Sequence, residues 1–266
     1  MKALRYIIAV LIAAVIGLIC YQGLVTHTLT GSNLTKAILI LCGLIVSLLK
    51  GSRQSRATKA DYKAAYGHLI GNAFSEDPKL EKQLYKALDD FNRRKYPACL
   101  KKLDALRAAS SKSSDRFAVT VFTALCHSRM GRYQEAIQTY SNALLIREHS
   151  TVSSNMGNCY LELGKIEDAL ECFKRAIRAD ASNPNAHNNI AQLYIQTGNF
   201  EEALPYAQQA VALNGKMPQA LNAMAICHAM LGNEAEYESY FRRAVACGSD
   251  GKTLRTYIEN LLDFLI

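Results

Sequence analysis

The chain has 266 residues, of which 50% are hydrophobic and 20% are charged. This length and composition suffice for one large or two modest domains, and they exclude a disordered or low-complexity protein. The eight cysteines are too sparse for a secreted module held by disulfides, and no pair has the CxxC spacing of a zinc or redox site. A reduced compartment is therefore expected.

The formal charge of +8 is concentrated in the first part of the chain. Residues 1–63 hold eight basic residues and one acid, Asp61, for a net +7, whereas the remaining residues carry a net +1. A nucleic-acid-binding domain would gather its basic residues on a folded face. Here the excess flanks a hydrophobic region, so no nucleic-acid partner is expected.

Residues 1–50 are predicted to form a membrane anchor of two apolar helices. The run 4–25 is 22 residues long and has no charge after Arg5, which is enough to cross a bilayer as a helix. The apolar run 37–49 is shorter and reaches spanning length only as a helix over about 30–49, with Lys36 snorkelling to the interface. Basic residues before the first run and after the second favour a helical hairpin with the rest of the protein in the cytoplasm.

A cleaved signal peptide is the alternative for the first run, because basic residues precede its apolar core. The run is long for a signal core, no clear small-x-small cleavage site ends it, and a second apolar run follows. The hairpin is therefore favoured.

Residues 51–79 are predicted to be a basic juxtamembrane segment with an amphipathic helix. Its basic residues can hold to anionic lipid headgroups. An apolar stripe at helical spacing runs from Tyr62 to Ala73. This helix could cap the following domain or lie on the membrane surface.

The remainder of the chain is built from a repeat. Segments that begin at Met130, Leu163 and Thr197 superimpose, and a segment from Leu231 follows them more loosely. Their glycines Gly131, Gly164, Gly198 and Gly232 are spaced by 33, 34 and 34 residues, and each lies between two apolar-periodic segments. The repeating unit is therefore predicted to be a pair of helices joined by a turn.

The repeats resemble the tetratricopeptide repeat (TPR) family. The resemblance rests on small residues seven positions before each glycine, on aromatic residues after the turn, and on alanines in the second helix: Ala124, Gly157, Ala191 and Ala225; Tyr133 and Phe200; Ala136, Ala169 and Ala203. It implies an all-α solenoid of antiparallel helix pairs, with repeats at 117–149, 150–183, 184–217 and 218–250. A degenerate repeat over 80–113 lacks the turn glycine, and 251–266 is expected to be a capping helix.

Residues that could carry chemistry have structural explanations. Cys126, Cys159 and Cys227 occupy the same place in three repeats, so stacking keeps them about 10 Å apart and they are expected to be small buried residues. His127 and His228 are also equivalent and are expected to pack between helices. No nucleotide-binding or hydrolase motif is present. We expect no catalytic residues, no metal, no cofactor and no small-molecule substrate.

The resemblance implies that the inner faces of the first helices line a concave groove for a peptide. Offsets from the turn glycines place eight residues there: Phe122, Asn155, Asn158, Asn188, Asn189, Gln192, Gln196 and Asn222. Side-chain amides both donate and accept, so they can pair with the backbone of a bound chain. Asparagine is also common at some of these positions in the family, so part of the set could be inherited consensus. The basic clamp that chaperone-binding members use for a C-terminal carboxylate is missing from this central face, so a heat-shock chaperone tail is not the expected ligand.

The sequence therefore predicts a membrane-anchored TPR scaffold or adaptor that binds a protein or peptide in its groove, with the repeats on the cytoplasmic side. The alternative is an accessory or assembly subunit of a membrane enzyme or translocase, which would contact that complex through its apolar hairpin.

Overall fold

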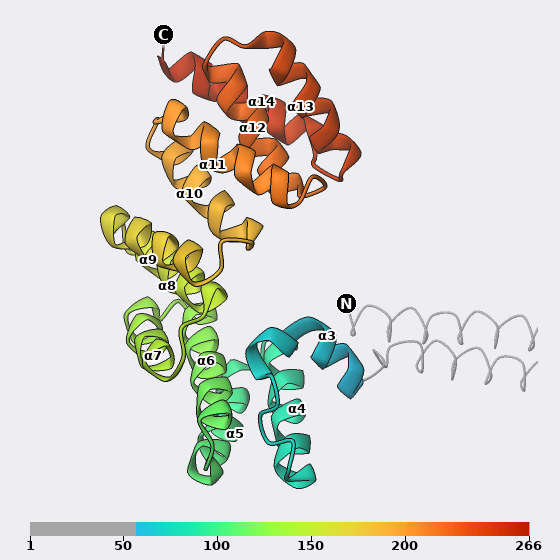
Figure 1. Cartoon of the computed structure of the whole chain (residues 1–266), viewed down its shortest axis with the longest axis vertical. Helices are drawn as coiled ribbons and strands as arrows, with labels where there is room; N and C mark the ends of the chain where they lie inside the picture. The colour runs from blue at the N-terminus through green and yellow to red at the C-terminus, as the bar shows by residue number, and fades with distance from the viewer. Residues whose placement is uncertain (1–56, 266) are drawn as a thin grey trace, which may run out of the picture. The chain divides into compact units, whose positions relative to one another are not determined.

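The computed structural model describes residues 57–265, which lie almost entirely in the second of two compact units, 1–58 and 59–266 (Figure 1). The two predicted membrane helices, 4–25 and about 30–49, fall outside the described residues. Between residues 57 and 265, none of the helices combines the length and the apolar character that crossing a bilayer requires.

The described residues form an all-α domain of twelve helices. Their bounds are α3 Lys59–Ile70, α4 Pro78–Asn92, α5 Tyr96–Ala109, α6 Ser113–Arg129, α7 Tyr133–Ile146, α8 Ser150–Glu162, α9 Ile166–Ala179, α10 Pro184–Gln196, α11 Phe200–Leu213, α12 Pro218–Met230, α13 Glu234–Ala246 and α14 Gly251–Leu265. From α4 to α13 they pair in sequence, and each pair packs on the next (Figure 1). The first helices α6, α8, α10 and α12 also contact one another in succession, so they share one face of the array. The expected helical repeat array is confirmed.

One type of turn joins the two helices of each pair. The turn glycines of the four clear repeats have φ between 71° and 77°, a left-handed conformation that costs glycine little. The next residue closes the turn by donating its amide hydrogen to the carbonyl four residues before the glycine, as Lys165 N does to Tyr160 O at 2.9 Å. In the α4–α5 pair Arg94 takes this position with φ 59°, and Lys95 N donates to Asp90 O at 2.8 Å. The first pair therefore keeps the turn without its glycine.

Small residues let the paired helices approach closely. Ala124, Ala191 and Ala225 are fully buried, and the equivalent Gly157 lies against the ring of Phe173 on α9. A Cβ at position 157 would be 2.5 Å from Phe173 Cε1.

The α3 helix packs against α4 and α6. It buries Tyr62, Leu69 and Ile70, and Tyr62 stacks on Tyr85 of α4 with ring centroids 5.5 Å apart. The Tyr62 hydroxyl also donates to Asp89 Oδ1 at 3.2 Å. The apolar stripe of this helix thus lies on the repeat array.

At the other end, α14 covers the last repeat by packing on α12 and α13. It buries its own Leu254 and Ile258, whereas Tyr257 remains 41% exposed. Asp250 caps the helix, since its carboxylate accepts hydrogen bonds from Lys252 N at 3.1 Å and from Thr253 Oγ1 at 2.7 Å.

Candidate partner-binding groove

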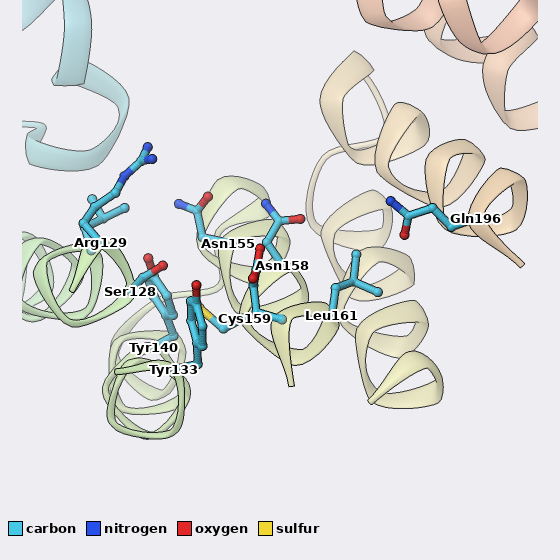
Figure 2. A pocket seen from close by; sticks show the side chains of 11 residues that line it. Ser128, Arg129, Tyr133, Tyr140, Asn155, Asn158, Cys159, Leu161 and Gln196 are labelled. Atoms are coloured by element: carbon cyan, nitrogen blue, oxygen red, sulfur yellow. The ribbon is translucent and has the colours of Figure 1, made fainter. Parts of the chain in front are cut away.

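Two hollows lie along the first helices of the array. The Arg129 hollow, of about 580 Å³, lies between the repeats of α6, α8 and α10 (Figure 2). Its polar lining consists of Ser128, Arg129, Tyr133, Tyr140, Asn155, Asn158, Glu162 and Gln196.

The Tyr257 hollow, of about 510 Å³, is formed by α10, α12 and α14. It combines amides with an apolar wall, and its lining is Asn188, Gln192, Gln219, Asn222, Ile226, Asp250, Thr253, Leu254 and Tyr257. Together the two hollows follow the first helices α6, α8, α10 and α12 and end at the capping helix α14.

Six of the eight residues predicted for the groove line these hollows. Asn155, Asn158 and Gln196 line the Arg129 hollow, and Asn188, Gln192 and Asn222 line the Tyr257 hollow. Asn222 is partly engaged within the chain, because its Oδ1 accepts a hydrogen bond from Ser249 Oγ at 2.7 Å. Asn189 is half-buried and lines neither of the two hollows.

The eighth residue, Phe122, does not form part of an open surface in this structure. It is fully buried, and its ring meets those of Tyr66 at 5.2 Å and Phe91 at 5.8 Å edge to face. Because Tyr66 belongs to α3, this helix occupies the place on α6 where a ligand was expected.

The sequence prediction missed Arg129 and Glu162. Both lie two residues before a turn glycine, as Gln196 does in the third repeat. Applying the same offset to every repeat would have found them. The contribution of α14, through Thr253 and Tyr257, depends on how the last helix folds back onto α12 and has no counterpart in the repeat pattern.

The lining of the Arg129 hollow is rich in hydrogen-bond donors. Within the described residues, Arg129 forms no ion pair, and Asn155 and Asn158 make no hydrogen bond. Burial raises the pKa of Tyr140 well above its usual value. Burial raises the pKa of Tyr133, and the nearby carboxylate of Glu162 adds to the effect. Both phenols are therefore protonated donors at neutral pH.

The candidate chemical residues have packing roles. Cys126, Cys159 and Cys227 are buried free thiols; burial raises the pKa of Cys227 to about 12, so it stays a thiol at neutral pH. His228 stacks on Tyr240 with ring centroids 5.5 Å apart. Over residues 57–265, no group of three or more histidine, cysteine, aspartate or glutamate side chains is placed to hold a metal ion.

Family models match three overlapping parts of the chain. A model described as TPR repeat matches residues 157–198, one described as Tetratricopeptide repeat matches 189–252, and one described as Anaphase-promoting complex, cyclosome, subunit 3 matches 103–176. Among curated proteins, none matches this sequence.

Solved structures share the fold at low sequence identity. A crystal structure of MamA is 12% identical with a TM-score of 0.53 over 60% of this chain and 93% of its own. TTC0263, a thermophilic TPR protein in Thermus thermophilus, is 18% identical with a TM-score of 0.52 over 69% of this chain and 98% of its own. A tetratricopeptide repeat protein from Parabacteroides merdae is 24% identical with a TM-score of 0.53 over 63% of this chain and 66% of its own. Residues 157–252 therefore resemble the tetratricopeptide repeat family, and the solved structures share the fold of repeated helical pairs.

Proposed function

We propose that this protein is a membrane-tethered scaffold that holds a protein or peptide partner in the groove along its first helices. The observation that carries the proposal is the pair of hollows that follow α6, α8, α10, α12 and α14. A TPR domain is consistent with a protein–protein interaction scaffold, because the shared face of a solenoid offers an extended binding surface.

The amides of the groove are suited to hold a peptide backbone. In the described part of the chain, Asn155, Asn158, Gln192 and Gln196 have no hydrogen-bond partner. Each amide can donate to a backbone carbonyl and accept from a backbone N–H. Four such groups along one face can therefore bind main chain whatever its side chains are.

The tether is supported by the sequence. The apolar runs 4–25 and 37–49 and their basic flanks favour a hairpin that leaves the repeats on the cytoplasmic side. Tethering would raise the local concentration of a partner at the membrane. Alkaline extraction of membranes, followed by protease digestion of intact and opened vesicles, tests both the anchor and its orientation. Release of the full-length chain by alkali would contradict the tether.

Crosslinking in native membranes tests the groove. We expect the full-length chain to lose its crosslinked partners when Asn155, Asn158, Gln192 and Gln196 are all replaced by alanine. The matched control replaces four exposed amides of the second helices by alanine, namely Gln134, Gln138, Asn142 and Gln208, and should keep the same partners in mass spectrometry. An unchanged partner set in the groove variant would rule out the groove as the binding surface.

A further inference from the structure

We propose that the Arg129 hollow binds the carboxylate of a single acidic side chain, so that the partner is a peptide segment with an aspartate or glutamate at this point. The inference rests on the proposed function of the groove and adds the chemistry of its ligand. It is carried by a free cation, a buried hydroxyl without an acceptor, and the charge balance of the lining.

The cation is Arg129, in the last turn of α6. Figure 2 shows Arg129 and Asn155 projecting toward the same open space, with Tyr133 and Tyr140 below them. The Arg129 guanidinium has no ion pair with any described residue. Its planar fork of N–H groups matches the two oxygens of a carboxylate. The amides of Asn155 and Asn158 can donate to the same group.

The second observation is the hydroxyl of Tyr140. This side chain lines the hollow, is fully buried, and has no hydrogen-bond partner for its hydroxyl among the described residues. A buried hydroxyl without a partner lowers stability, and phenylalanine fills the equivalent positions on α9 and α13 as Phe173 and Phe241. An acceptor brought by a ligand would satisfy this donor.

The charge balance favours a carboxylate over a phosphate group. Glu162 is the carboxylate among the lining residues, and it lies near the Tyr133 phenol. One arginine with several neutral donors can balance one negative charge, whereas a phosphorylated side chain would bring nearly two. A lysine or arginine of the partner would meet Arg129 unfavourably.

The test is a selection of displayed random dodecapeptides on the full-length chain. We expect the peptides selected on the wild type to share an aspartate or glutamate at one position. The peptides selected on Arg129→Gln should have no such shared acidic position. The control Arg132→Gln changes an exposed arginine just past the turn and outside the hollow, so it should keep the acidic position. Peptides without an acidic position in the wild-type selection, or an unchanged preference in Arg129→Gln, would overturn the inference while leaving groove binding intact. Failure of the wild type to enrich any peptide would contradict the groove function itself, and this inference with it.

A second variant separates binding from folding. Tyr140→Phe removes a hydroxyl that has no partner within the described residues, so its unfolding midpoint should equal or exceed that of the wild type. Affinity for a selected acidic peptide should fall about tenfold, as expected for the loss of a hydrogen bond to a charged group. Affinity for the same peptide with its acid changed to glutamine should stay within about twofold. Equal loss for both peptides, or no loss for either, would contradict the role of Tyr140.

Discussion

At the scale of single residues, Gly157 determines how closely α8 can approach α9. Its position is occupied by alanine in the other three clear repeats, but here the fully buried ring of Phe173 fills the space. Gly157→Ala would place a Cβ 2.5 Å from Phe173 Cε1. Because neither helix can move freely, we expect a loss of about 1–3 kcal/mol in the free energy of unfolding, measured by urea denaturation.

The control for this prediction is Gly215→Ala. A Cβ at Gly215 would make only an ordinary contact, 3.7 Å from Val211 O. The control should be neutral or slightly stabilising, by up to about 1 kcal/mol, because alanine reduces the entropy of the unfolded chain. Equal effects of the two substitutions would show that the close approach to Phe173 does not limit the packing.

Arg94 carries a backbone cost that the other turns avoid. It has φ 59° at the position where four repeats have glycine, and its side chain forms no ion pair with described residues. Left-handed backbone costs a non-glycine residue about 1–2 kcal/mol, while glycine gives back part of that in chain entropy. Arg94→Gly should therefore raise the free energy of unfolding by up to about 1 kcal/mol in urea denaturation. Arg93→Gly, in the preceding right-handed residue with φ −82°, should instead destabilise.

At the scale of the helix, α3 is joined to α8 through two histidines. The His149 Nε2–H donates to the carbonyl of His68 at 3.0 Å, and the two rings lie 5.9 Å apart. Nδ1 of His149 is buried and has no hydrogen-bond partner among the described residues. Burial lowers the pKa of both histidines. For His149, the hydrogen bond to the His68 carbonyl opposes this effect, Arg147 and His68 add to it, and Asp180 opposes it more weakly.

This arrangement predicts that acid loosens α3 from the array. Because the folded pKa is lowered, the unfolded chain binds more protons, so stability is lost as pH falls below the ordinary value of about 6.5 and through the folded pKa. Limited proteolysis after residue 70, together with the urea midpoint, should report this loss as pH falls below about 6.5. His149→Gln keeps a donor for the His68 carbonyl without titrating, and should flatten the pH dependence. His228→Gln, which alters a ring stacked on Tyr240, should leave it unchanged.

The sequence predicts those features of the array that repeat. The pairing of helices, the turn and the small buried positions all follow from fixed offsets to a glycine, since each repeat must present the same face to its neighbours. The placement of α3 does not follow in this way. Its stripe from Tyr62 to Ala73 shows that one face is apolar. Either the repeat array or the membrane surface could cover that face. The contact of Tyr66 with Phe122 joins residues 56 positions apart, and no local pattern encodes it.

The sequence also predicts those groove residues that follow the repeat, but not those whose surroundings depend on α3. Amides at equivalent offsets were found, because the first helices stack with one face aligned. Phe122 was misplaced, since its offset is that of a groove residue while its burial depends on α3. The sequence does not indicate that the Tyr140 hydroxyl is unsatisfied, because an unsatisfied donor is a property of its surroundings and not of its residue type.

At the scale of the whole array, the described core is divided near the junction of α9 and α10. One cluster of buried residues runs from Tyr62 on α3 to Cys172 on α9, and another runs from Ala191 on α10 to Ile258 on α14. A small cluster of Ala169, Phe173, Ile190 and Leu193 lies between them. Since stability in a repeat protein is close to a sum over repeats and their interfaces, this junction is where cooperative unfolding should break first.

Ile190→Ala is therefore predicted to separate two unfolding transitions. Ile190 is fully buried, and its truncation should cost about 2–5 kcal/mol. The loss falls on the interface and leaves both larger clusters intact, so urea unfolding followed by hydrogen exchange should show α10–α14 opening before α4–α8. Leu84→Ala removes a comparable buried side chain inside the first cluster and should weaken α4–α8 instead, without opening the C-terminal helices first. The Arg129 hollow reaches across the same junction through Gln196. A bound peptide that contacts both sides would stabilise only the joined state and should bring the two transitions of Ile190→Ala back together.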